Sequence, residues 1–169
     1  MRIRVQDKEY YELIRDIINA PSVQSLKKIQ HHFFQSRFDH VVTVSYYSYR
    51  IGKLLHLDYK AMARAGLLHD LFFYDWKRTH LTFTQHAYIH PRIAIKNAER
   101  ITTLTPLEKE IILHHMSGAT MDMCKSKEAL IVNLVDDYSA VSEFTRGRYY
   151  TIFSKHVPYL LSKALIQFK

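Results

Sequence analysis

Histidine and aspartate side chains recur at the edges of apolar segments along this chain of 169 residues. The strongest case is Ala65-Gly66-Leu67-Leu68-His69-Asp70-Leu71-Phe72, where an adjacent His-Asp pair is embedded in apolar residues. A carboxylate in apolar surroundings must be paired or bound to a cation, or its pKa rises until it is neutral. A divalent metal ion held by His69 and Asp70 would satisfy both side chains. The alternative is a solvated or hydrogen-bonded pair at a helix end.

Four other segments also place a polar metal ligand at the edge of an apolar helical stretch. Imidazole and carboxylate ligands together suit first-row transition metals and do not choose among them. In two of the segments the candidate ligands are adjacent, so the residues by themselves leave both members open. The candidates are His40 after Arg37-Phe38-Asp39, His90 before Pro91, His114 or His115 after Ile111-Ile112-Leu113, and Asp136 or Asp137 after Ile131–Val135.

The elements that position these residues are predicted to be helices. Apolar residues recur at helical spacing almost throughout, and 4 glycines and 4 prolines are too few for a sheet protein with many tight turns. We therefore predict an all-α fold. The expected helices cover 10–18, a segment after Ser22, 39–55, a segment after Asp58 through Leu68, a segment opened by Pro91, a segment opened by Thr105-Pro106, 126–144 and 149–166.

Capping residues and helix breakers set the expected helix ends. Ser22 and Asp58 are predicted N-caps, and Thr105 with Glu108 has the spacing of a capping box. Residues 75–85 are predicted to form a loop, and 117–125 a second one. Pro91 is expected in the first turn of its helix, where its missing N–H costs nothing. This would place His90 at the cap and His86 in the approach to the helix.

In chain order the candidates form the pattern H…HD…H…H…D, which resembles the HD superfamily of metal-dependent phosphohydrolases. The resemblance runs from about Arg37 to Glu143. It implies that residues 1–169 form a single HD-type domain, an all-α bundle of about seven to nine helices. It also implies a hydrolase acting on phosphomonoesters, phosphodiesters or pyrophosphates.

The resemblance assigns a role to each candidate ligand. His40 is the first ligand, and His69 and Asp70 form the catalytic HD pair, with Asp70 bridging two metals. The resemblance favours Asp136 over Asp137 as the closing carboxylate. It favours His115 over His114 as a partner of His90 at a second metal. One or two divalent ions are expected, with iron, manganese, nickel and zinc all compatible.

The implied substrate is a small phosphorylated molecule, with a nucleotide as the expected class. Phosphoryl transfer needs cations around the non-bridging oxygens. Members of the superfamily related to cyclic-dinucleotide phosphodiesterases carry a Gly-Tyr-Pro motif after the HD pair. This sequence has none, so the resemblance argues against cyclic di-GMP as the substrate. The residues proposed to face the substrate are Arg37, Lys77, Arg78, His86, Arg92, Lys96 and His114.

Composition narrows the remaining possibilities. The formal net charge of +8 is dispersed along the chain, which does not favour a nucleic-acid-binding surface. One cysteine, no signal-type N-terminus and no membrane-length apolar run lead us to expect a cytoplasmic protein. The main alternative function is a non-catalytic HD module that binds metal or nucleotide as a sensor or structural partner. A degenerate module would be expected to lose ligands, whereas all six positions are filled here.

Overall fold

Every regular element in the described part of this chain is a helix. The structure is a computed structural model, and it describes residues 7–30, 35–75, 78–143 and 145. Within these ranges there is no strand, and the β-type pairs are two isolated bridges, Gln30 with Ser36 and Ser117 with Thr120. The all-α class predicted from the apolar periodicity is therefore confirmed.

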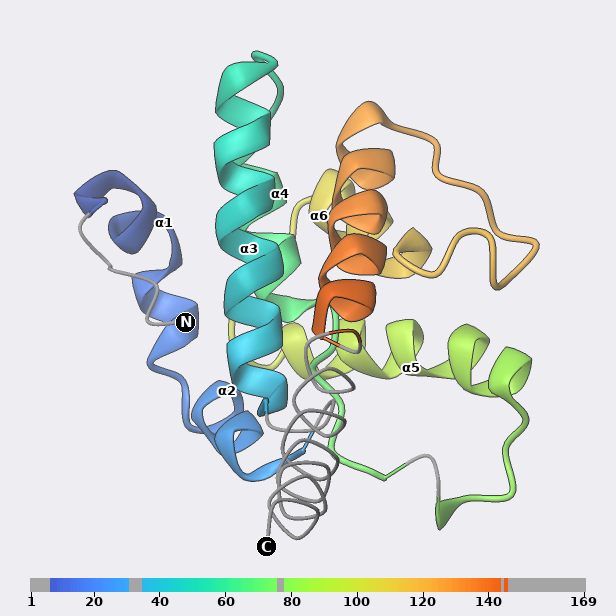
Figure 1. The fold of residues 1–169 in the computed structure, drawn as a ribbon. Helices are drawn as coiled ribbons and strands as arrows, with labels where there is room; N and C mark the ends of the chain where they lie inside the picture. Colours follow the sequence, from blue (N-terminus) through green and yellow to red (C-terminus); the bar gives the residue numbers. More distant parts are fainter. Residues whose placement is uncertain (1–6, 31–34, 76–77, 144, 146–169) are drawn as a thin grey trace, which may run out of the picture.

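The named helices follow one another with short connections, except around residues 69–82 and 115–126. A further helix, which carries no label in Figure 1 and is drawn there in orange, covers residues 127–143. It is called helix 127–143 below. The named elements are α1 (Lys8–Ile18), α2 (Pro21–Ser25), the 3₁₀-helix η1 (Leu26–Lys28), α3 (Arg37–Leu54), α4 (Tyr59–Leu68), α5 (Phe83–Ala98) and α6 (Pro106–His114).

Side-chain caps explain where most of these helices begin. An N-cap oxygen accepts a hydrogen bond from one of the first backbone N–H groups, which has no partner inside the helix. The predicted caps at Asp58 and Thr105 are confirmed. Ser22 is not a cap, because α2 begins one residue earlier with Pro21 in its first turn and Ala20 as its N-cap.

Helices α3 and α4 pack against each other at the centre of the fold. In Figure 1, α1 and α2 lie on one side of α3, and α6 and helix 127–143 lie on the other. A Cβ added at Gly66 on α4 would lie 3.0 Å from Ser45 Cα on α3, and glycine therefore permits this close approach. Val41, Val44 and Leu67 are among the apolar side chains buried along the two helices.

Arg64 on α4 connects three helices. Its Nε donates a 2.8 Å hydrogen bond to Glu108 Oε1 on α6, and its guanidinium also contacts Asp16 Oδ1 on α1 at 3.1 Å. The Glu108 side chain is only 3% exposed. Its second oxygen accepts the 2.7 Å hydrogen bond that completes the capping box with Thr105. One buried carboxylate thus stabilises both a helix start and the contact between α4 and α6.

The loop predicted for residues 75–85 ends earlier in the structure, and the helix that follows it begins well before Pro91. Helix α5 starts at Phe83, with Thr82 as N-cap and Gln85 completing a capping box. Pro91 lies inside this helix. A proline there removes one backbone hydrogen bond, but the capping box and the buried face of α5 outweigh that loss. Both His86 and His90 are therefore helical residues one turn apart.

At the carboxyl end, the helix predicted over 126–144 is found at 127–143. The helix predicted over 149–166 lies outside the described residues. Among the residues that the structure describes, no helix is long and apolar enough to cross a membrane.

Candidate metal centre

Five helical elements deliver the six predicted ligands to one place. His40 lies in the first turn of α3, and His90 lies in the middle of α5. His69 and His115 are the C-cap residues of α4 and α6, so each follows the last helical residue directly. Asp70 follows His69, and Asp136 lies on helix 127–143. All six are buried, from 0% exposed at His69 to 8% at Asp136.

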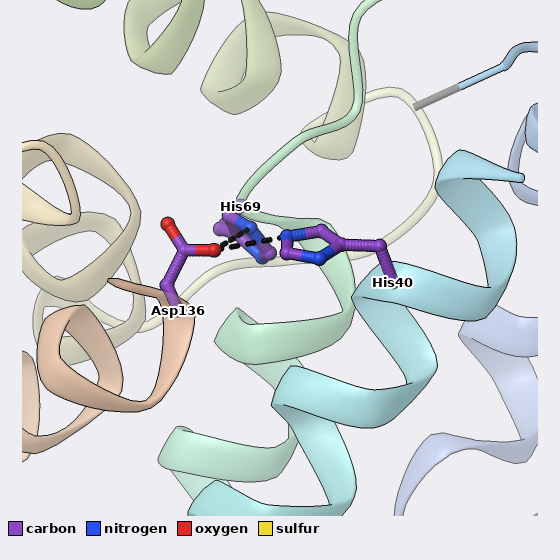
Figure 2. Close-up of side chains that lie close together, drawn as sticks. All are labelled: His40, His69 and Asp136. Carbon is purple, nitrogen blue, oxygen red and sulfur yellow. Dashed lines mark hydrogen bonds and ion pairs between the residues drawn. The ribbon is translucent and has the colours of Figure 1, made fainter. Parts of the chain in front are cut away.

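One half of the cluster is centred on Asp136. Its Oδ1 atom lies 2.9 Å from His40 Nε2 and 3.5 Å from His69 Nε2. Figure 2 shows the three side chains converging from α3, from the end of α4 and from helix 127–143. One ligand atom from each residue falls within 4.8 Å of the others, so the three together could hold a metal ion.

The other half is centred on Asp70. Its Oδ1 atom lies 3.3 Å from His90 Nε2 and 3.8 Å from His115 Nε2. The two imidazoles also approach each other, with 2.8 Å between their Nε2 atoms. His69, Asp70 and His115 form the second group whose ligand atoms lie within 4.8 Å of one another. Because His69 belongs to both groups, the two halves are contiguous.

Three of the four imidazoles are oriented by the same device. The Nδ1 atom of each lies within hydrogen-bond distance of a backbone carbonyl one turn earlier in the chain. The distances are 2.8 Å from His69 to Gly66 O, 2.9 Å from His90 to His86 O and 2.8 Å from His115 to Ile112 O. A carbonyl oxygen only accepts hydrogen bonds, so each Nδ1 carries the proton and each neutral ring has its lone pair on Nε2.

This protonation pattern tests whether a metal suits the site. With both protons on Nδ1, the neutral rings of His90 and His115 direct two lone pairs at each other across 2.8 Å, an arrangement that requires a cation or an added proton between them. His69 Nε2 is buried and has no hydrogen-bond partner among the described residues. Divalent metal ligation satisfies all three Nε2 atoms and both carboxylates at once. The donor set therefore fits a divalent metal.

The electrostatics of the metal-free cluster agree with this requirement for positive charge. Burial alone would lower the pKa of His40, but hydrogen bonds to the carboxylates of Asp136 and Glu143 raise it to about 10. Burial would raise the pKa of Asp136, yet His69 and His40 hold it well below its usual range. Burial, together with His90 and His69, lowers the pKa of His115 to about 3. At neutral pH His115 thus keeps a lone pair for a metal, while the Asp136 half holds a proton where a metal would bind.

The structure separates the adjacent candidates. His115 points at Asp70, whereas His114 is buried elsewhere and its Nδ1 has no hydrogen-bond partner among the described residues. Asp136 contacts two histidines, whereas the exposed Asp137 accepts a 2.9 Å hydrogen bond from Asn133. His115 and Asp136 are therefore the members placed at the cluster.

Arg37 and His86 lie beside the cluster, but both side chains form contacts with other residues of the protein. Arg37 is 4% exposed, donates to the carbonyl of Phe72 at 2.5 Å and lies 3.6 Å from the centre of the Phe72 ring. His86 stacks on His90 with 4.5 Å between ring centres, and its Nδ1 lies 3.0 Å from the Tyr74 hydroxyl. Burial and the neighbouring His90 lower the pKa of His86 to about 4. These contacts pack the segment after the HD pair against α3 and α5.

The other predicted substrate residues lie farther out. Arg92 forms a 3.0 Å ion pair with Asp122, and Lys96 is exposed. On a helix they are rotated by roughly 200° and 240° from His90, so both face away from it. Arg78, in the loop after the HD pair, pairs with Asp75 at 3.3 Å and remains 87% exposed. Lys77 lies outside the described residues.

Two polar residues with hydrogen-bond contacts in or beside the cluster were not among the predicted site residues. Glu143 contacts His40, and Tyr74 contacts His86. Glu143 lies seven residues after Asp136, a spacing that places both on one face of a helix. That spacing was the available signal for Glu143. The contact of Tyr74 arises from the path of an irregular segment and has no comparable signal.

The fold and the cluster define an all-helical protein with a candidate centre for one or two metals. The family model of the HD domain matches residues 37–141, which is more than half of the chain. The chain therefore belongs to the HD-domain family, and the resemblance predicted from the ligand pattern is confirmed. No curated protein and no solved structure gave a match.

Proposed function

We propose that this chain is a metal-dependent phosphohydrolase acting on a small phosphorylated substrate, with a nucleotide as the expected class. The observation that carries the proposal is the set of three imidazoles, His69, His90 and His115, whose Nδ1 atoms are anchored to backbone carbonyls. Their Nε2 atoms face two buried carboxylates. A purely structural cluster has no need for three lone pairs directed into one space.

Asp70, Arg37 and Arg78 have different roles in the proposed site. Asp70 is at the centre of one half of the cluster, and it shares a candidate metal group with His69, which also belongs to the other half. A metal pair bound there would polarise a phosphoryl oxygen and lower the pKa of a water molecule. The Arg37 guanidinium holds the Phe72 carbonyl and ring, which fixes the segment that follows Asp70. In the described part of the loop after Asp70, Arg78 is a cationic residue that is exposed enough to contact a phosphate group.

The test begins with metal content, measured by elemental analysis of the purified protein. Two adjacent pairs supply matched controls: Asp136→Asn should lose metal and Asp137→Asn should keep it, and His115→Gln should lose metal where His114→Gln does not. No metal in the wild-type protein, and no uptake of added Mn²⁺, Fe²⁺ or Zn²⁺, would overturn the proposal.

The second step is a substrate screen with the reconstituted protein. Nucleoside mono-, di- and triphosphates, dinucleoside polyphosphates and bis-p-nitrophenyl phosphate cover the three bond classes. Hydrolysis that disappears in Asp70→Ala supports the proposal. A protein that binds metal but hydrolyses none of these esters would instead be a non-catalytic HD module.

A further inference from the structure

His40 differs from the other three histidines of the cluster in how its ring is oriented. The others use a carbonyl of the preceding helical turn, whereas His40 Nδ1 lies 3.1 Å from Glu143 Oε1, a side chain 103 residues later in the chain. Both side chains are buried, at 1% exposed for His40 and 7% for Glu143. The orientation of this ligand therefore depends on a contact between separate helices.

Helix 127–143 holds the His40 ring from both edges. Asp136 Oδ1 lies 2.9 Å from Nε2, and Glu143 Oε1 lies 3.1 Å from Nδ1. The two carboxylates are two helical turns apart, about 10 Å along the axis at 1.5 Å per residue. The two ring nitrogens point away from each other, which matches this separation.

Glu143 is itself held in place. In the amide orientation that satisfies both groups, the Gln35 side-chain nitrogen donates to Glu143 Oε1 at 2.8 Å and to Oε2 at 3.3 Å. Gln35 precedes α3 by two residues, so it comes from the same end of the helix as His40. The carboxylate is thus fixed between the start of α3 and the end of helix 127–143.

We propose that Glu143 is a positioning residue that holds the proton on His40 Nδ1 and directs the Nε2 lone pair toward the metal site. A carboxylate that accepts the second N–H of a metal-bound imidazole fixes the ring and increases its basicity. Helix 127–143 then supplies one ligand, Asp136, and orients another. This inference rests on the proposed metal site, and it adds a residue that the HD ligand pattern does not include.

The experiment compares Zn²⁺ affinity, measured by competition with a chelator, among wild type and three variants. Removal of such a partner typically weakens metal binding 10–100-fold, and we expect this loss in Glu143→Ala. Glu143→Gln keeps an oxygen that can accept the Nδ1 hydrogen, so its affinity should stay within about threefold of wild type. Val141→Ala, at an exposed position of the same helix, is the matched control and should match wild type.

A spectroscopic measurement separates positioning from general loosening of the helix. In the Zn²⁺-loaded protein, ¹H–¹⁵N spectra of the imidazoles should show a slowly exchanging His40 Nδ1 proton in wild type and Glu143→Gln. Glu143→Ala, compared at saturating Zn²⁺, should lack it. The urea midpoint of each metal-free variant reports whether the fold is intact.

The outcomes separate this inference from the proposed function. If wild type binds no metal, the proposed function is wrong. If wild type binds metal and Glu143→Ala binds it equally well, the positioning role is wrong while the metal site stands. Equal losses in Glu143→Ala and Glu143→Gln would also overturn the positioning role, because charge alone would then account for the effect.

Discussion

Full metal affinity should require the close approach of α3 and α4 as well as the ligands themselves. Gly66 on α4 lies against the backbone of Ser45, and its carbonyl accepts the 2.8 Å hydrogen bond from His69 Nδ1. In Gly66→Ala, the new Cβ would lie 3.0 Å from Ser45 Cα and 3.2 Å from Ser45 N. Because these are backbone atoms, no rotamer change relieves the contact. Helix α3 must move away from α4.

The required movement follows from the distances. Ordinary contact begins at 3.4 Å, so α3 must withdraw by about 0.4 Å. Metal–ligand distances tolerate deviations of about 0.2 Å, and His40 and His69 are carried on the two helices that separate. We therefore expect metal affinity to fall at least about tenfold. Overpacking costs about 1–3 kcal/mol and alanine regains about 1 kcal/mol of helix propensity, so the net loss of stability should be about 1 kcal/mol.

A second glycine, Gly52 on α3, provides the control. A Cβ at Gly52 would lie 2.7 Å from Met62 Sδ and 2.9 Å from Tyr59 Cα, so Gly52→Ala also crowds the contact between α3 and α4. Gly52 is twelve residues from His40, or about 18 Å along the helix. Its substitution should destabilise the protein at least as much and leave metal affinity within about threefold of wild type.

Two measurements decide the outcome. Urea unfolding of the metal-free proteins gives the change in stability, and isothermal titration with Mn²⁺ gives the affinity. If Gly66→Ala loses stability but binds Mn²⁺ as tightly as wild type, the spacing of α3 and α4 does not control metal affinity. If both glycine variants lose affinity to the same extent, proximity to the ligands is irrelevant and the expected effect of Gly66 is also wrong.

Three further predictions concern stability, protons and metal removal. Arg64→Met should lower the free energy of unfolding in urea by about 3 kcal/mol, because it leaves the buried Glu108 carboxylate without its cation. The control is Arg15→Met, at an exposed ion pair, which should change the free energy of unfolding by less than about 1 kcal/mol. Because the pKa of His40 is raised to about 10, this ring is protonated at pH 7 in the metal-free protein. Metal binding at pH 7 should therefore release at least one proton, and metal affinity should fall as pH falls. Titration calorimetry in buffers of different ionisation enthalpy counts the released protons. Zero release would contradict a protonated His40 ring in the metal-free protein. Removing the metal with a chelator should lower the free energy of unfolding by about 2.7 kcal/mol, compared with protein at a metal concentration 100 times Kd. This loss lowers Tm by roughly 5–10 °C for a chain of this size. Equal Tm values with and without chelator would show that metal does not bind the folded state.

The helical class and most helix starts could be predicted from the sequence because they depend on local physics. Apolar periodicity reports which face is buried, and side-chain caps such as Asp58 and Thr105 act within four residues. The same rule would have placed the start of α5, since Thr82 and Gln85 also have capping-box spacing. Pro91 does not mark the helix start, because a capped helix with a buried face accommodates a proline in its interior.

The choice between adjacent residues required the tertiary structure. Neighbours on a helix point about 100° apart, so Asp136 and Asp137 share a sequence context but face different surroundings. Which of them meets His40 depends on how helix 127–143 docks against α3. The same holds for His114 and His115 at the end of α6.

Sequence proximity to a candidate ligand does not predict where a cationic side chain points. Arg37 stands three residues before His40, yet its guanidinium is buried against Phe72, 35 residues later in the chain. Arg92 lies two residues from His90 but faces the opposite side of α5 and pairs with Asp122. Nearness along the chain does not determine direction, which is set by helix phase and by long-range partners.

What the sequence determined by itself was the set of segments that carry candidate ligands, because an imidazole or carboxylate beside an apolar helical segment is a chemical property of the residues. The tertiary structure alone decided which member of each adjacent pair reaches the cluster and how the candidate ligands are oriented. His40 obtains its two carboxylate partners from a helix about a hundred residues away, Asp136 on one ring nitrogen and Glu143 on the other. A hydrogen bond between distant segments exists only after both helices have packed against the core, and no local pattern encodes it.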